Sequence, residues 1–197
     1  MREAIKDSII LGIDPGTNIL GYGILKIKEG HLEMEAMGVI DLRKCTDIYM
    51  KLGRIYERII GLIEAFKPDE LAIEAPFFGK NVQSMLKLGR AQGVVIAAAI
   101  SHEIPITEYA PLKIKMAITG KGQATKEQVA RMLQRLLKIK EDQMLPYLDS
   151  TDALAVAYCH YLQKGRIETN NKYSGWADFV KKNKNLVAFP IHFVKKD

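Results

Sequence analysis

Four acidic residues stand where predicted strands end or a predicted helix begins, and their side chains could carry chemistry together. Asp14 and Glu74 each follow a short run of apolar, mostly branched residues that is typical of a buried strand. A charge at the end of such a strand is costly unless it meets water, a partner or a metal ion. Asp149 and Asp152 are three residues apart on a predicted helix, so they share one of its faces. These positions would allow all four carboxylates to meet in one site.

Carboxylates that meet in this way favour metal-dependent chemistry. Four of them would raise one another's pKa values unless cations neutralised their charge. Mg²⁺ is a hard cation that binds a few carboxylates together with water and phosphate oxygens. Two such ions, roughly 3.5–4 Å apart, can activate a water molecule and stabilise the leaving oxygen when a phosphodiester bond is cleaved. The pattern therefore predicts a phosphodiester-cleaving site that uses Mg²⁺, for which Mn²⁺ would substitute.

Each acid also has a purely structural interpretation. Asp14 could cap the turn that follows it, and Glu74 could be a surface residue at the edge of a sheet. Asp149 is a good helix N-cap and Asp152 a good first-turn residue, because the helix dipole favours acids at both positions. Only the presence of all four acids favours a catalytic site over these alternatives.

Hydrophobic periodicity predicts the elements that must position these acids. Apolar runs predict strands at residues 9–14, 22–27, 32–40, 71–74 and 104–108. Apolar residues at steps of three and four predict helices at residues 48–66, 80–101, 111–120, 125–138 and from about 149. The order of these elements predicts an α/β fold with a five-stranded mixed sheet flanked by helices. Sites in open α/β sheets lie beyond the carboxyl ends of strands, so Asp14 and Glu74 are expected at that edge if their strands are neighbours.

Local signals refine several of these elements. Asp47 is an N-cap candidate for the first helix, and Thr125 to Gln128 has the pattern of a capping box. Pro105 indicates that the last strand lies at a sheet edge. The second half of the helix at residues 80–101 is almost wholly apolar, so we expect it to be deeply buried.

Length and composition indicate one globular domain with a short extension. We expect a globular domain at residues 1–165 that carries the four acids, and a basic tail, weakly ordered or docked on the surface, at residues 166–197. The net charge of +6 favours a polyanionic partner. No apolar run has the length of a membrane span and the start has no signal-peptide pattern, so the expected location is cytoplasmic. Cys45 and Cys159 are expected as reduced thiols, one in a loop and one on a helix.

Several segments carry a resemblance to a known family. Leu11–Thr17 (LGIDPGT), Gly21–Gly23 (GYG), Ile73–Glu74 and Asp149–Ala155 (DSTDALA) look like the RuvC family of Holliday-junction resolvases, which have the ribonuclease H-like fold. The segment Asn81–Gly93 also resembles that family, and the likeness runs from about residue 8 to residue 164 with its motifs in order. Asp-Pro-Gly-Thr alone is less specific, because actin-like ATPases and sugar kinases begin in a similar way.

The resemblance implies a homodimeric, Mg²⁺-dependent endodeoxyribonuclease of homologous recombination and DNA repair. Such an enzyme resolves a four-way DNA junction by paired symmetric nicks in two strands of like polarity. Asp14, Glu74, Asp149 and Asp152 fall on the family's catalytic acids, which implies two metal ions in each active site. The third acid varies between Asp and His in the family and is Asp149 here. In the family, the exposed edge of the helix at residues 80–101 contributes to the dimer, and the RuvA–RuvB branch-migration complex is a further suggested partner.

The resemblance also suggests which residues touch DNA. Phe77 matches the family aromatic thought to stack on a base near the junction centre, and a ring in this loop can replace lost base stacking. Alternatively, Phe77 or Phe78 packs into the core or the dimer contact. Lys115 and Lys126 fall on family positions implicated in DNA contact or catalysis, and Lys126 opposes the helix dipole at a helix start. Further phosphate contacts are expected from Lys80, Lys87, Arg90, Lys113 and Lys121. The alternative for each of these lysines is a solvated basic surface.

Two other classes of function stay open at the level of the sequence. An actin-like or sugar-kinase-type phosphotransferase would share the Asp-Pro-Gly-Thr motif, but it needs a second nucleotide-binding lobe for which the chain is too short. A related nuclease that acts on RNA, or a junction binder that does not cleave, would share the fold. The four acids argue against a protein that only binds junctions. They do not distinguish DNA from RNA as the substrate, because cleavage of either would use the same metal chemistry. The sequence specifies neither the cutting-site preference nor the dimer geometry.

Overall fold

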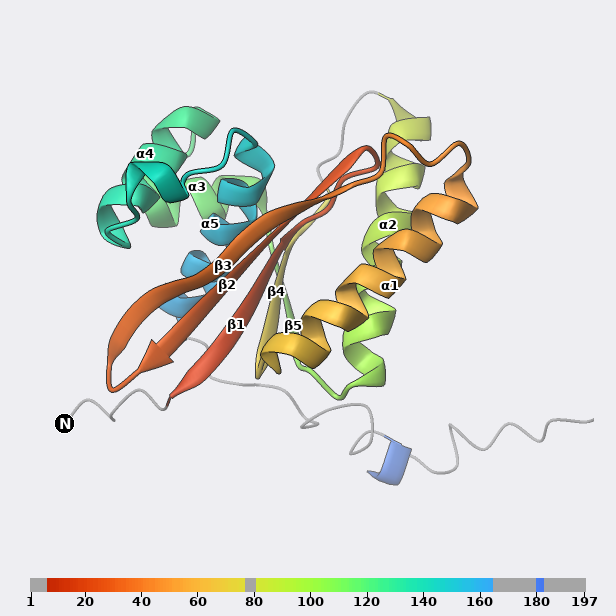
Figure 1. The fold of residues 1–197 in the computed structure, drawn as a ribbon, viewed down its shortest axis with the longest axis horizontal. Coiled ribbons are helices and arrows are strands. Elements are labelled where there is room, and N and C mark those ends of the chain that lie inside the picture. Colours follow the sequence, from red (N-terminus) through yellow and green to blue (C-terminus); the bar gives the residue numbers. More distant parts are fainter. Residues whose placement is uncertain (1–6, 77–80, 165–179, 183–197) are drawn as a thin grey trace, which may run out of the picture.

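The computed structural model describes residues 7–76, 81–164 and 180–182. Within these ranges, five strands form one mixed sheet in the order β3-β2-β1-β4-β5 (Figure 1). The strands are β1 (Ser8–Asp14), β2 (Ile19–Lys28), β3 (His31–Asp41), β4 (Glu70–Glu74) and β5 (Ile106–Tyr109). β1, β2 and β3 form an antiparallel meander, whereas β4 runs parallel to β1 and β5 parallel to β4. This arrangement confirms the predicted five-stranded mixed sheet, with the strand after Pro105 at an edge.

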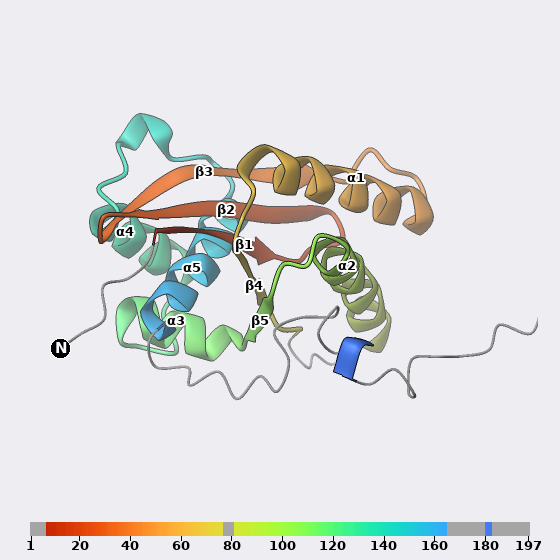
Figure 2. The same cartoon turned by 90° about the horizontal axis from the view of Figure 1, so that it is seen from below.

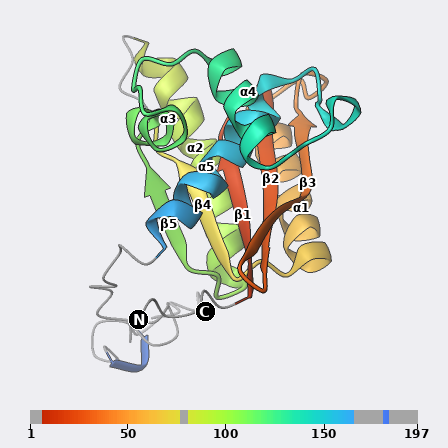
Figure 3. The same cartoon turned by 90° about the vertical axis from the view of Figure 1, so that its left-hand side faces the viewer.

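Helices cover both faces of this sheet. They are α1 (Ile48–Phe66), α2 (Val82–Ser101), α3 (Pro111–Thr119), α4 (Lys126–Leu136) and α5 (Leu148–Gln163), with a short 3-10 helix at Glu141–Gln143. α1 and α2 pack on one face (Figure 2). α5 crosses the other face, and α3 and α4 pack against it (Figure 3). The sheet therefore has a separate hydrophobic core on each side.

The alternation of side chains along β1 and β4 directs two acids to the α5 side. Ile13 in β1 and Ile73 in β4 are fully buried in the core that contains α1 and α2. Successive side chains of a strand point to opposite faces of the sheet. Asp14 and Glu74, each the next residue on its strand, are therefore directed toward α5.

Glycines in β1 and β2 let the backbone of α5 approach the sheet closely. A Cβ atom at Gly12 would overlap the carbonyl oxygen of Ala153, and one at Gly21 would overlap the carbonyl oxygen of Asp149. Both positions need glycine because the helix backbone occupies the space that a side chain would take. The first turns of α5 are consequently held directly over β1 and β2.

Helices α1 and α4 begin as their sequence signals predict. Asp47 caps α1 by accepting hydrogen bonds from the backbone N–H groups of Tyr49 and Met50, at 2.7 and 2.9 Å. Thr125 and Gln128 form the predicted capping box at the start of α4. These caps satisfy backbone donors that would otherwise lack partners at the helix N-termini.

Helix α2 departs from its prediction in two respects. It begins at Val82 rather than residue 80, because Asn81 caps it by accepting a hydrogen bond from the backbone N–H of Ser84 at 3.1 Å. Its apolar second half is not buried all round, since Val95 is fully buried whereas Ile100 is 42 % exposed. Only one stripe of α2 packs on the sheet and α1, and the prediction of deep burial is wrong for its outer face.

The predictions about the tail, the cysteines and membranes can be compared with the described residues. Of the expected tail at residues 166–197, only residues 180–182 are described, and they are helical. The boundary near residue 165 therefore stays a prediction. Cys45 lies in a loop and Cys159 is buried in α5, as predicted, and both are free thiols. Among the described helices, none is long and apolar enough to cross a membrane.

Candidate active site

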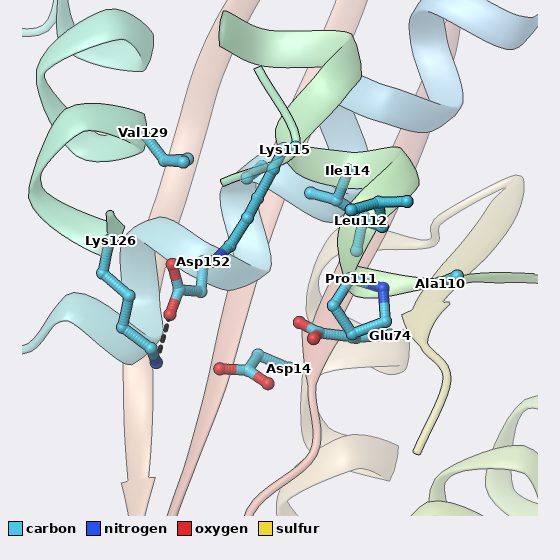
Figure 4. A pocket seen from close by; sticks show the side chains of 12 residues that line it. Asp14, Glu74, Ala110, Pro111, Leu112, Ile114, Lys115, Lys126, Val129 and Asp152 are labelled. Atoms are coloured by element: carbon cyan, nitrogen blue, oxygen red, sulfur yellow. Dashed lines mark ion pairs between the residues drawn. The ribbon is translucent and has the colours of Figure 1, made fainter. Parts of the chain in front are cut away.

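Asp14 and Glu74 lie side by side at the carboxyl edge of the sheet. β1 and β4 are parallel neighbours, and Ile13 pairs with Ile73 in the residue before each acid. Both carboxylates line one cavity of about 510 Å³ between the sheet edge and α3, α4 and α5 (Figure 4). The prediction that the two strands are neighbours is confirmed.

Asp149 and Asp152 reach the same edge on the first turns of α5. Tyr147 occupies the N-cap position of this helix, so the alternative interpretation of Asp149 as an N-cap is wrong. Gly21 packs against the backbone of Asp149 and pairs with Asp14 in the β1–β2 ladder. This contact brings the start of α5 over the end of β1, where Asp152 lines the cavity together with Asp14.

Lys126, the first residue of α4, bridges the two acids of α5. Its Nζ atom forms a close ion pair with Oδ2 of Asp152 (Figure 4). The same atom lies 3.8 Å from Oδ1 of Asp149. The Asp152 side chain is only 13 % exposed, whereas half of the Lys126 side chain is exposed. The two acids of α5 therefore share one positive charge at the mouth of the cavity.

Burial and crowding disfavour ionisation of the two strand acids. Burial raises the pKa of Asp14 to about 8. The negative charge of Glu74 adds to this rise, and the positive charge of Lys126 opposes it. Burial likewise raises the pKa of Glu74 to about 7, and the charge of Asp152 adds to that rise. Shifts of this kind are expected where carboxylates have too little positive charge nearby.

Asp152 and Lys126 stabilise each other's charged forms. Burial raises the pKa of Asp152, and the hydrogen bond and charge of Lys126 limit that rise. Burial lowers the pKa of Lys126, but the hydrogen bond and charge of Asp152 outweigh burial, so the pKa rises above its ordinary value. Lys126 is therefore a cation in the cavity at neutral pH.

The donor set suits a hard divalent cation. The acids offer carboxylate oxygens, which are preferred ligands of Mg²⁺. The raised pKa values of Asp14 and Glu74 indicate that Lys126 alone does not neutralise the cluster. In the described part of the chain, no group of three or more His, Cys, Asp or Glu side chains is arranged to hold one ion between them. The fit to a metal thus rests on the chemistry of the acids and on their shared location. Asp149 and Asp152 pair with Lys126 rather than pointing at a common ion position.

Two of the four lysines predicted on or near α3 and α4 lie in the cavity. Lys115 and Lys126 both line it. Lys115 also opposes the rise in the pKa of Glu74, which indicates that its charge acts on the acids. Lys113 lies outside the cavity lining, with its Nζ atom 5.2 Å from the centre of the Tyr109 ring. A cation over an aromatic face is a stabilising contact in its own right, so Lys113 has a structural role.

The other predicted DNA contacts lie farther from the acids or are not described. Lys87 and Arg90 are exposed on α2, and Lys121 is exposed on the loop between α3 and α4. Phe77 and Lys80 lie outside the described residues. The structure therefore brings Asp14, Glu74, Asp152, Lys115 and Lys126 together in the cavity lining. Asp149 lies outside that lining, beside Lys126, and Lys87, Arg90 and Lys121 lie on the exposed surface.

One positioning contact was not predicted from the sequence. Nζ of Lys51 in α1 donates hydrogen bonds to the carbonyl oxygen of Thr17 and to Oδ1 of Asn18, each at 2.8 Å. Both acceptors belong to the turn that follows Asp14. A lysine near a helix start carries no local signal for such a contact, because the partners are more than thirty residues away.

A second unpredicted contact anchors the far end of α5. Nε2 of His160 lies 2.5 Å from Oε2 of Glu70, and Nδ1 of His160 lies 2.8 Å from the Tyr109 hydroxyl. Nζ of Lys164 lies 2.5 Å from the other carboxylate oxygen of Glu70. The helix that carries Asp149 and Asp152 is thus tied to β4 and β5 at its opposite end.

Comparisons with known proteins agree with this site. The family model "Crossover junction endodeoxyribonuclease RuvC" matches residues 10–160. The chain is 63 % identical over 187 residues to the protein of that name from Bacteroides fragilis. That match covers 95 % of this chain and 100 % of that protein. It is 57 % identical over 185 residues to the protein of the same name from Porphyromonas gingivalis, with coverage of 92 % and 98 %. It is also similar to the solved structure of T. thermophilus RuvC in complex with Holliday junction substrate, with a TM-score of 0.73, 31 % identity and coverage of 81 % of this chain and 96 % of that chain.

These similarities, which span most of the chain, exclude the phosphotransferase alternative. They also confirm the ribonuclease H-like fold with its mixed five-stranded sheet. The chain belongs to the RuvC family of crossover junction endodeoxyribonucleases.

Proposed function

We propose that this RuvC-family nuclease resolves four-way DNA junctions by symmetric nicks in two strands of like polarity, in homologous recombination and DNA repair. The observation that supports this most is the convergence of Asp14, Glu74 and Asp152, from β1, β4 and α5, on one cavity. The T. thermophilus relative was solved in complex with a Holliday junction substrate, which supports the same substrate class for this chain. The bacterial origin of the relatives supports a cytoplasmic location.

The proposal assigns two Mg²⁺ ions, or Mn²⁺ in their place, to the four acids Asp14, Glu74, Asp149 and Asp152. Such ions supply an activated water molecule and stabilise the leaving oxygen of the phosphodiester. Asp14 is the proposed shared ligand, because its pKa responds to the charges of all three other acids. Lys115 and Lys126, which line the cavity, are proposed to contact the phosphate group.

The wider DNA surface in this proposal surrounds the cavity. Lys87 and Arg90 on α2 and Lys121 on the loop after α3 are exposed and can reach phosphates, which position DNA without reading its sequence. Phe77 is proposed to stack on a base near the junction centre, and Lys80 to add a phosphate contact. Lys113 is a weaker candidate, because its ammonium group lies over the Tyr109 ring.

Symmetric nicks require two active sites in a fixed relation, so the proposal includes a homodimer. A two-fold interface provides that relation with one surface patch from each copy. The outer face of α2 is the proposed patch, because Leu86 and Ile100 are 54 % and 42 % exposed there. Docking of a RuvA–RuvB branch-migration complex is proposed on family resemblance alone.

A cleavage assay on matched substrates tests the proposal. A synthetic four-way junction, duplex DNA, single-stranded DNA and an RNA–DNA hybrid are each incubated with Mg²⁺ or with EDTA. We expect paired nicks in the junction with Mg²⁺ and none with EDTA. Cleavage of the RNA–DNA hybrid in preference to the junction would support the alternative of a nuclease that acts on RNA.

The variant Asp14→Asn separates binding from cleavage. It removes a proposed metal ligand but no basic contact, so it should abolish cleavage and still bind the junction. A gel-shift titration beside the cleavage assay measures both properties. Equal loss of binding and cleavage would contradict the assigned role of Asp14.

A further inference from the structure

The ammonium group of Lys126 occupies the space between acids to which a metal ion has been assigned. Its Nζ atom forms an ion pair with Asp152 and lies 3.8 Å from Oδ1 of Asp149. Burial raises the pKa values of Asp14 and Glu74, and the charge of Lys126 opposes that rise. One lysine therefore acts on all four carboxylates, and in the described part of the chain no three of them surround a single ion position.

We propose that Lys126 is a displaceable counter-ion, which holds Asp149 and Asp152 in the free protein and must leave them, toward a DNA phosphate, before they can ligate a divalent cation. The inference rests on the proposed function, since it takes the acids as metal ligands and DNA as the substrate. An ammonium group and a divalent cation compete for the same carboxylate oxygens, because both stabilise their negative charge. The lysine thus controls how completely the site is loaded with metal.

The backbone of Lys126 is fixed, whereas its side chain is free to move. The capping box holds the start of α4, with the N–H of Thr125 donating to Oε1 of Gln128 at 3.0 Å. One turn along the helix, Val129 is buried in the core that contains α5. The Lys126 side chain itself is 50 % exposed, so rotations about its bonds can carry the ammonium group away from the acids. Release therefore requires no movement of either helix.

A DNA phosphate gives the released lysine a new partner. Lys126 lines the cavity that a phosphate must enter to reach the acids, and lysine is a common partner of phosphate oxygens. The junction would stabilise the released position of the ammonium group and so leave the acids open. By linkage, binding of the junction and binding of the metal then strengthen each other.

Lys115 provides a matched comparison. It lines the same cavity, and its charge acts on Glu74 and Asp152. The ion pairs of Asp149 and Asp152 go to Lys126, and Lys115 forms none in the described part of the chain. A displaceable counter-ion and a merely nearby charge therefore predict different results for the same Lys→Met change.

Metal binding in the absence of DNA tests the competition. Mn²⁺ is titrated into the wild type, Lys126→Met and Lys115→Met at neutral pH, and free Mn²⁺ is measured by electron paramagnetic resonance. We expect Lys126→Met to lower the dissociation constant of the weaker Mn²⁺ site by about tenfold, because no ion pair has to break first. Lys115→Met should lower it by less than about threefold, because it removes only a nearby charge. Lys126→Gln should match Lys126→Met, which separates the effect from a folding defect of one variant.

The reactivity of Lys126 measures its release in the wild type itself. Acetic anhydride modifies a free amine faster than a paired one, and mass spectrometry of peptides gives the rate at each lysine. We expect Mg²⁺ to raise the rate at Lys126 by about threefold or more over the rate in EDTA, as the ion pair is lost. Lys28 is the internal reference, because it is exposed at the end of β2 that lies beside the start of β1, away from Asp14.

Three outcomes would overturn the displaceable counter-ion. The first is a Lys126→Met variant that binds Mn²⁺ no more tightly than the wild type. The second is equal tightening in Lys126→Met and Lys115→Met, and the third is a Lys126 reactivity that Mg²⁺ leaves unchanged. In each case the wild type still binds metal, so the proposed function survives. A wild type that binds neither Mn²⁺ nor Mg²⁺ would instead overturn the metal assignment of the proposed function and this inference with it.

Discussion

Nε2 of His160, near the end of α5, lies 2.5 Å from a carboxylate oxygen of Glu70 at the start of β4. The contact joins two elements that are ninety residues apart in the sequence. The His160 side chain is 5 % exposed, so water competes little for this contact. It fixes the position of α5 along the sheet, and thereby the position of the acids on the first turns of that helix.

Replacing Glu70 by Gln should destabilise the protein at neutral pH. The hydrogen bond with His160 lowers the pKa of Glu70 to about 2, and Lys164 contributes to the lowering. A carboxyl group with a lowered folded pKa contributes stability above its unfolded value of 4.5, and this stability is lost as the pH falls toward 2. We expect Glu70→Gln to lose about 1–2 kcal/mol in the free energy of unfolding near neutral pH, measured by urea titration, and less near pH 3.

A matched control for this prediction is Glu35→Gln. Glu35 pairs with Lys26 at 3.6 Å on the surface, where both side chains are about 40 % exposed. Exposed pairs of this kind contribute roughly 0–1 kcal/mol, so the control should stay close to the wild type. A Glu70→Gln deficit that grows as the pH falls would contradict the assigned role of Glu70.

Replacing Asp14 by Asn should raise the Tm in EDTA at alkaline pH. Burial raises the folded pKa of Asp14 from 3.8 to about 8. Between these two pKa values the carboxyl group is ionised in the unfolded chain but holds its proton in the folded protein. The wild type therefore loses stability as the pH rises from about 4 to about 8. Asparagine carries no such penalty. We expect the variant to melt about 3–6 °C higher at about pH 8.5, with the difference closing near pH 4, as measured by differential scanning fluorimetry.

Mg²⁺ provides the complementary measurement for Asp14. A ligand that binds the folded state but not the unfolded chain stabilises the folded state by an amount that grows with the logarithm of its concentration above Kd, so Mg²⁺ should raise the Tm of the wild type. The same addition should change the Tm of Asp14→Asn much less. A variant that melts below the wild type in EDTA at alkaline pH would show that Asp14 is already neutralised by its surroundings.

Replacing Lys51 by Met should slow cleavage without weakening junction binding. The change removes the hydrogen bonds to Thr17 and Asn18 that hold the turn after Asp14. Small displacements of a catalytic group lower rates strongly, so we expect kcat to fall about tenfold while the junction Kd changes by less than about twofold. Arg54→Ala is the control, because Arg54 is exposed on the same helix and pairs only with Glu57 among the described residues. Equal effects of the two variants on kcat would argue against a positioning role for Lys51.

Replacing Gly12 by Ala should disrupt both stability and activity. The new Cβ atom would overlap the Ala153 carbonyl oxygen, so α5 must move away from the sheet. We expect a loss of about 3 kcal/mol or more in the free energy of unfolding, together with loss of cleavage. Gly53→Ala in α1 is the matched control, since nothing lies within 4 Å of its added Cβ atom, and it should gain about 0.5–1 kcal/mol. Similar unfolding midpoints for the two variants would contradict direct backbone packing of α5.

The sequence predicted those parts of the fold that depend on local signals. The carboxyl ends of β1 and β4, the Asp47 cap and the capping box at Thr125 are decided by neighbouring residues, and each was found where it was expected. Other strand ends were less accurate, since β2 begins at Ile19 rather than residue 22 and β5 begins at Ile106 rather than residue 104. The alternative interpretation of Asp149 as an N-cap is wrong because it considered local preference alone, and Tyr147, two residues earlier, occupies that position. The burial of α2 was overestimated because small apolar residues such as Ala97 were counted without regard to which face they occupy.

The candidate site was predictable in its acids but not in its supports. Asp14 and Glu74 can be identified from the sequence because each is a charged residue at the end of an apolar strand. Lys51, His160 and the packing of Leu112 against Gly122 depend on residues brought together only by folding, and no spacing in the sequence signals them. The unpredicted residues are therefore those that position the acids or shape the cavity around them.

The close packing of α5 on Gly12 and Gly21 has a consequence for how this enzyme can change over evolutionary time. Main-chain atoms of α5 in contact with Gly12 and Gly21, rather than side chains, set the distance between the helix acids and the strand acids. The core on the α1 and α2 side can therefore exchange one apolar residue for another, and alter the melting temperature, while the catalytic distances stay the same. Thermal stability and catalytic geometry can therefore evolve separately, because they depend on opposite faces of one sheet.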